Sequence, residues 1–155
     1  MIPRTPTEQT DAFATPQQVL DFWFEELTPK DWFRKDTDLD RTIVARFGET
    51  LSAAARCECW HWRETPSGRL AEILVLDQFS RNVHRNTPAA FAQDPLALAL
   101  AQEAIAAGDD ARLSTPQRIF VYMPFMHSES LNASAATHTA TPSWDGSRQP
   151  RKSSS

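Results

Sequence analysis

Apolar residues recur at helical spacing through most of this chain. In the first such segment, residues 16–27, large apolar side chains occupy the i, i+3, i+4 and i+7 positions: Leu20, Trp23, Phe24 and Leu27. Thr15-Pro-Gln-Gln18 precedes them and has the pattern of a capping box with proline at the first helical position. The same periodicity predicts four further helices, at about 38–54, 70–86, 94–108 and 114–123.

Thr-Pro pairs mark several boundaries of these segments. Four of them stand directly before a periodic segment, in the order N-cap and then first helical residue: Thr15, Thr65, Thr87 and Thr115. Thr28-Pro29 reads as a break, followed by a loop that contains Trp32 and Phe33. We expect Pro124 to stop or kink the last helix, because proline lacks the amide donor, so that another helix begins at Phe125.

The predicted helix at 70–86 begins apolar and becomes polar without losing its period. Leu70, Leu74, Asp77, Arg81 and His84 fall along one stripe, so charged and polar groups occupy positions where the pattern calls for core. Burying such groups costs several kcal/mol unless they are paired. The stripe therefore predicts a polar network or site.

No segment alternates with period two, and glycine is scarce at 4 residues, so strands and hairpins have little support. The pattern predicts an all-α fold of antiparallel helical hairpins, arranged as a stack or a bundle. At 155 residues the chain fits one domain. We place that domain at residues 16–131, between a disordered segment at 1–15 and a disordered tail at 132–155 that is rich in Ser and Thr.

Composition argues against several classes of protein. With 16 Lys plus Arg against 20 Asp plus Glu, the formal charge is -4, which makes nucleic acid a poor partner. No apolar run is long enough to span a membrane, and no signal peptide is recognisable, so a cytoplasmic location is expected. Cys57, Cys59 and His61 could be three ligands of a metal site, but two reduced thiols are favoured, and no metal or cofactor is predicted.

Five short strings carry a family signature: Val19–Phe24, Trp32–Phe33, Leu76–Asn82, Thr87–Asp94 and Tyr122–Glu129. Their order and spacing over residues 16–131 resemble a bacterial family, domain of unknown function 924. The resemblance implies an array of tetratricopeptide-like helical hairpins, and it assigns no biochemical role. Family members usually have proline where this chain has Ser80 and a large apolar residue at His84, so His84 falls outside any shared site.

In the family the helical domain continues past the last of these strings, whereas here Leu131 gives way to the Ser/Thr-rich tail. A shifted reading frame or a truncated gene would produce such an ending. We therefore expect C-terminal helices to be missing and the apolar surface beneath them to be exposed. Resequencing the locus tests this expectation, because an intact frame with the same tail would contradict it.

The candidate polar site consists of residues from two strings of the family signature, Leu76–Asn82 and Tyr122–Glu129: Asp77, Gln78, Arg81, Asn82, His127 and Glu129. Asp77 and Arg81 stand at the i, i+4 spacing of an ion pair. A buried network that fixes helix docking is favoured about two to one over a ligand site, in which Arg81 would bind a substrate anion. Glu129 could simply cap a helix N-terminus, and Asp77, His127 and Glu129 could also be metal ligands.

Two functions follow from these features. The first is a soluble helical-repeat module that binds or scaffolds a protein or peptide, on the analogy of the fold. Aromatic residues could line its groove, although such side chains are more often core: Phe22, Trp23, Phe24, Trp32, Phe33, Trp60 and Trp62. The alternative is a small-molecule binder or enzyme with a pocket around Asp77, Arg81, His127 and Glu129.

Overall fold

The computed structural model describes residues 13–138, with side chains up to residue 128, and every regular element in this part is helical. The prediction of an all-α fold is confirmed. Seven α-helices occur in this range: α1 (Pro16–Asp21), α2 (Pro29–Trp32), α3 (Thr37–Ala55), α4 (Pro66–Leu74), α5 (Ser80–Val83), α6 (Asp94–Ala106) and α7 (Thr115–His138). In this range no helix is both long enough and apolar enough to cross a membrane.

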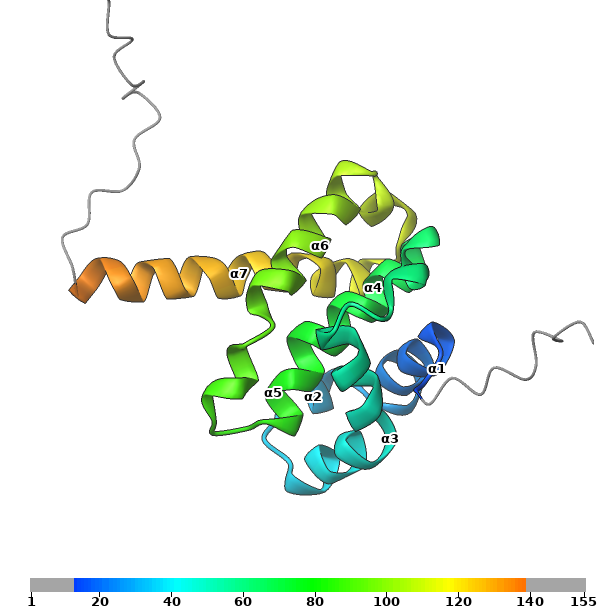
Figure 1. The fold of residues 1–155 in the computed structure, drawn as a ribbon, viewed down its shortest axis with the longest axis horizontal. Coiled ribbons are helices and arrows are strands. Elements are labelled where there is room, and N and C mark those ends of the chain that lie inside the picture. Colours follow the sequence, from blue (N-terminus) through cyan, green and yellow to red (C-terminus); the bar gives the residue numbers. More distant parts are fainter. Residues whose placement is uncertain (1–12, 139–155) are drawn as a thin grey trace, which may run out of the picture.

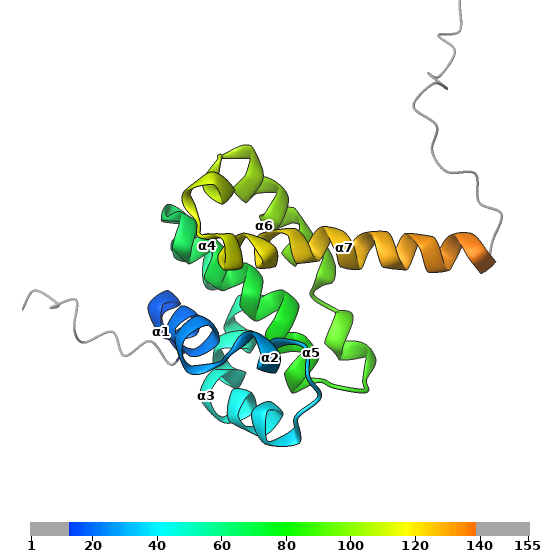
Figure 2. The ribbon, with the colours of Figure 1, turned by 180° about the vertical axis from the view of Figure 1, so that it is seen from behind.

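Helix α4 lies at the centre of the fold (Figure 1). It contacts α1 on one side and both α6 and α7 on the other, while α3 packs against α5. Figure 2 shows the same arrangement from behind, with the C-terminal part of α7 extending away from the other helices. The tetratricopeptide arrangement of these helices stays a prediction.

Two π-helical turns, in which the backbone is wider than in an α-helix, interrupt the predicted helices. Phe22–Glu26 continues α1, so the predicted helix at 16–27 is present but changes geometry halfway. Val75–Phe79 joins α4 to α5 in the same way. Such turns have no sequence signature comparable to a cap, and they occur frequently at functional sites.

Two of the four predicted threonine caps are present, at Thr15 and Thr65, whereas Thr87 makes no side-chain cap and precedes a 3-10 turn. Thr15 accepts a hydrogen bond from the Gln18 amide, and the Gln18 side chain accepts one from the Thr15 amide at 2.9 Å, which completes the capping box. At residue 115 the cap is Ser114, whose hydroxyl accepts from the Gln117 amide. Thr28 also starts a short helix, α2, where a loop was predicted.

The core is built largely from aromatic side chains of several helices. Rings that are buried and in mutual contact come from α3, α7 and the two π turns: Phe22, Trp23, Phe47, Phe79 and Phe120. Of the aromatic residues considered for a groove, Trp62 is also buried, whereas Phe33 and Trp60 are each 64% exposed. Three of the seven side chains in that set are therefore core, and Phe24 and Trp32 are partly buried against it.

The folded part begins before and ends after the predicted range 16–131. The Phe13 ring contacts Trp62, and the amide of Ala14 donates to the Thr50 hydroxyl at 2.9 Å. At the other end α7 continues past the predicted boundary to His138. The rest of the predicted disordered segments, residues 1–12 and 139–155, lies outside the described residues.

Candidate functional site

Asp77 lies in the π turn between α4 and α5 and organises the site. Its side chain is 1% exposed, yet it receives three donors. The Gln78 Nε2 donates to Oδ2 at 2.9 Å, Arg81 Nη1 donates to Oδ1 at 3.2 Å, and Nδ1 of His127 lies 2.8 Å from Oδ1. The structure thus brings these four predicted residues together, one of them from α7.

Arg81 connects α5 to the start of α6. Its guanidinium donates two parallel hydrogen bonds to the Asp94 carboxylate, at 2.9 and 3.0 Å, and a third to the backbone carbonyl of Asp77 at 2.7 Å. The same group stands over the Phe91 ring, 5.2 Å from its centroid. Bidentate pairs of this kind fix the guanidinium in one plane.

Asn82 belongs to a second set of polar contacts one turn further along α5. Its Nδ2 donates to Oδ1 of Asp40 on α3 at 2.9 Å, and Arg85 donates to both oxygens of the same carboxylate. Burial raises the pKa of Asp40, but hydrogen bonds from Arg85 and Asn82 outweigh it and hold the pKa below the usual value. Helices α3 and α5 are linked through this carboxylate.

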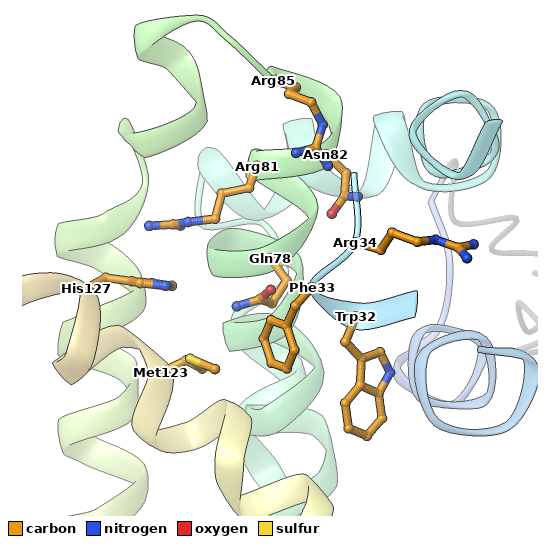
Figure 3. Close-up of a pocket in the computed structure, with 9 residues that line it drawn as sticks. All are labelled: Trp32, Phe33, Arg34, Gln78, Arg81, Asn82, Arg85, Met123 and His127. Carbon is orange, nitrogen blue, oxygen red and sulfur yellow. The ribbon is translucent and has the colours of Figure 1, made fainter. Parts of the chain in front are cut away.

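A pocket of about 240 Å³ opens between these contacts, α2 and α7 (Figure 3). We call it the polar pocket; its lining combines cationic, amide and apolar side chains: Trp32, Phe33, Arg34, Gln78, Arg81, Asn82, Arg85, Met123 and His127. Of the six predicted site residues, Gln78, Arg81, Asn82 and His127 therefore face it directly. Asp77 stands behind them and holds three of these side chains in place.

Of the two outcomes predicted at Pro124, a stop or a kink, the stop is wrong, because α7 continues through this residue. Proline in a helix removes one hydrogen bond, at a cost of about 3 kcal/mol. Pro124 is nevertheless buried, as are Phe120 and Val121 in the preceding turn of the helix. His127 therefore lies in the interior of α7, and Glu129 is not at the helix N-terminus where a capping role was considered. The side chain of Glu129 lies outside the described residues.

His84 also departs from the prediction, since the stripe placed it among buried positions. Helix α5 ends at Val83, and His84 and the following residues turn away, with Asn86 in the left-handed region at φ 66°. The His84 side chain is exposed. The helical period therefore stops before His84.

The sequence did not predict three residues of these polar contacts, Asp40, Arg85 and Asp94, nor Arg34 and Met123 in the lining of the pocket. The contacts of the first three join positions 42, 45 and 13 residues apart, and helical spacing carries no information at such separations. Arg85 alone had a local signal, because it follows Arg81 by one helical turn. Among the described residues no group of three His, Cys, Asp or Glu side chains converges to hold a metal ion. Cys57 is exposed and Cys59 is buried.

The sequence and the fold were compared with known proteins. Residues 19–151 match the family described as bacterial protein of unknown function, DUF924. A solved structure of a protein of unknown function from Agrobacterium tumefaciens is similar, with 42% sequence identity and a TM-score of 0.70. The match covers 72% of this chain and 63% of the Agrobacterium protein, so this chain spans less than two thirds of that structure.

A comparison with curated proteins finds no match. The match to the family nevertheless covers most of the sequence and includes every residue that lines the polar pocket. The chain therefore belongs to the bacterial DUF924 family.

Proposed function

We propose that the polar pocket binds a small molecule and that His127 exchanges a proton with it. The observation that carries this proposal is the 2.8 Å contact between His127 Nδ1 and the buried carboxylate of Asp77. A carboxylate accepts hydrogen bonds and cannot donate, so the proton of a neutral imidazole is held on Nδ1. The Nε2 edge of the ring is then an acceptor, and His127 is one of the residues that line the pocket.

This is the arrangement of a general base with an orienting carboxylate. The pocket supplies the other components that such chemistry requires. Arg81, locked between Asp77 and Asp94, is a rigid donor beside the imidazole, and Trp32, Phe33 and Met123 form an apolar wall. Such a mixture of an apolar surface with a few fixed polar groups is typical of small-molecule sites.

The test is a thermal-shift screen of small metabolites on the full-length chain, followed by calorimetry for each compound that binds. A ligand of the folded state raises the Tm by mass action. We expect at least one compound to do so in the wild type and in His84→Gln, whose substituted side chain is exposed. The same compound should lose at least tenfold in affinity in His127→Gln. Equal affinity in His127→Gln would contradict the role of His127.

A second candidate function, protein binding, is favoured by one specific observation. Ile119, Tyr122 and Met126 lie at i, i+3 and i+7 on α7 and are 41%, 40% and 57% exposed, an apolar stripe on the surface. If these exposed residues of α7 form the functional surface, affinity capture with the wild type should return the same protein partner repeatedly. The double variant Ile119→Ser, Met126→Ser should lose that partner, and His127→Gln should retain it. The opposite pattern would favour the polar pocket.

A further inference from the structure

The two amides in the polar pocket have an orientation that the surrounding carboxylates determine. Nε2 of Gln78 donates to Asp77 at 2.9 Å, and Nδ2 of Asn82 donates to Asp40 at 2.9 Å. Because a carboxylate can only accept, each amide must turn its nitrogen toward the carboxylate and its oxygen away from it. In Figure 3 the oxygen of Asn82 points toward the side of the pocket where Gln78 lies.

These amide oxygens are acceptors that a ligand could satisfy. Gln78 is 6% exposed and Asn82 is 9% exposed, and both line the pocket. Gln78 lies in the π turn and Asn82 in the helical turn that follows, and both face the same pocket. Within the described residues, the hydrogen bonds of both amides are made by their nitrogens. A hydroxyl group on a ligand would satisfy one of these oxygens, and a protonated amino group would satisfy both.

The adjoining wall offers donors that suit an anion. Among the described residues that line the pocket, Arg34, Arg81, Arg85 and His127 are basic and none is acidic. The pair with Asp40 uses Nε and Nη2 of Arg85, so the Nη1 edge faces away from that carboxylate. Arg81 and Arg85 also line a second hollow beside Phe91, so both side chains are reachable from two sides. Guanidinium groups with a free edge recognise carboxylates directionally.

The remaining wall limits the size of the ligand and adds no polar group. The indole nitrogen of Trp32 already donates to the backbone carbonyl of Trp23 at 2.8 Å, so this ring presents carbon to the pocket. Phe33 and Met123 extend the apolar surface. The volume of about 240 Å³ is below the range of roughly 300–1,000 Å³ that is usual for drug-sized ligands.

We propose that the polar pocket recognises a small carboxylic acid that carries a hydroxyl or amino group. The carboxylate would bind Arg81 and Arg85, while a hydroxyl group donates to the oxygen of Gln78 or Asn82 and a protonated amino group donates to both. This inference rests on the proposed function and adds the chemical class of the ligand. A site with fixed acceptors rejects an analogue that lacks the matching donor, because its buried polar groups are left unpaired.

Matched compounds test the proposal without altering the protein. Lactate, propionate and lactamide form one set, and 2-hydroxyisocaproate, isocaproate and 2-hydroxyisocaproamide form a larger one. Leucine and leucinamide supply the amino counterpart. Binding to the full-length chain is measured by calorimetry. We expect a hydroxy or amino acid to bind at least tenfold more tightly than both the acid without the donor and the amide without the charge.

Arg85→Gln should abolish the preference for acid over amide, whereas Arg56→Gln, on an exposed arginine outside the pocket, should retain it. Equal binding of acid and amide by the wild type would overturn the inference. If a neutral or cationic compound instead binds best and still depends on His127, the inference fails and the proposed function stands. If no compound of any charge binds, both fail.

Discussion

The continuous helical stretch from α4 to α5 carries two buried carboxylates, Glu72 and Asp77, and the two differ in what surrounds them. Glu72 on α4 is 0% exposed and accepts both of its hydrogen bonds from Arg63, at 2.8 and 2.9 Å. Asp77, in the π turn, is 1% exposed and is shared by three residues from α5, α7 and the π turn itself. Only the second carboxylate stands behind the lining of the polar pocket.

This comparison teaches that a buried charge does not by itself indicate a functional site. Both oxygens of Glu72 accept from the one guanidinium of Arg63, which is the geometry of a structural pair, and neither residue lines the polar pocket. Gln78, Arg81 and His127 each contact Asp77 through one polar group, and all three side chains also line the polar pocket. A functional site is therefore better indicated by a donor or acceptor that stays unused beside a cavity than by a buried charge alone.

The largest expected effect is on the structural pair. Arg63→Ala leaves the carboxylate of Glu72 buried without its partner, and breaking such a pair costs about 3–5 kcal/mol. The free energy of unfolding, measured with urea, should fall by that amount. Arg56→Ala is the matched control, because Arg56 and Glu58 are at least half exposed and such pairs contribute at most about 1 kcal/mol. Similar losses in both variants would contradict the distinction.

The next effect concerns the shared carboxylate. Asp77→Asn keeps the shape but replaces charge-assisted hydrogen bonds, each of which contributes about 1.5–3 kcal/mol. We expect the free energy of unfolding to fall by about 2 kcal/mol, less than for Arg63→Ala, since the partners of Asp77 can be hydrated from the pocket. Ligand affinity should fall at least tenfold in Asp77→Asn and remain unchanged in Arg63→Ala wherever that variant is folded. Loss of binding in Arg63→Ala at a folded concentration would contradict the assignment.

The same contrast explains what the sequence could predict. Asp77, Gln78, Arg81 and Asn82 were predictable because they lie within two helical turns, where spacing alone places side chains on related faces. His127 came from the family resemblance and was then assigned to the wrong position in its helix, because burial of Pro124 is a tertiary effect. Asp40 and Asp94 were not predictable, since a carboxylate in the first turn of a helix looks the same whether it faces solvent or an arginine.

The third prediction uses the pH dependence of the link between α3 and α5. Hydrogen bonds from Arg85 and Asn82 hold the pKa of Asp40 in the folded protein below its usual value, so its stabilising contribution is present above about pH 4 and is lost as pH falls through the folded pKa. The free energy of unfolding, measured with urea at pH 5 and at pH 3, should decrease less between these two pH values in Asp40→Asn than in the wild type. The difference should be smaller than the effect of Asp77→Asn. An identical decrease in both proteins would show that Asp40 does not titrate with folding.

The smallest effect is expected at His84, which extends the comparison to the end of the same helix. If the helical period of Leu70, Leu74, Asp77 and Arg81 continued, His84 would be buried and its truncation would be costly. Because α5 ends at Val83 and the imidazole is exposed, His84→Ala should change the free energy of unfolding by less than about 0.5 kcal/mol. Ligand affinity should also be unchanged, since His84 does not line the polar pocket. A decrease in the free energy of unfolding above about 1.5 kcal/mol would mean that His84 is buried like the other residues of the stripe. It would contradict the end of the helical period before His84.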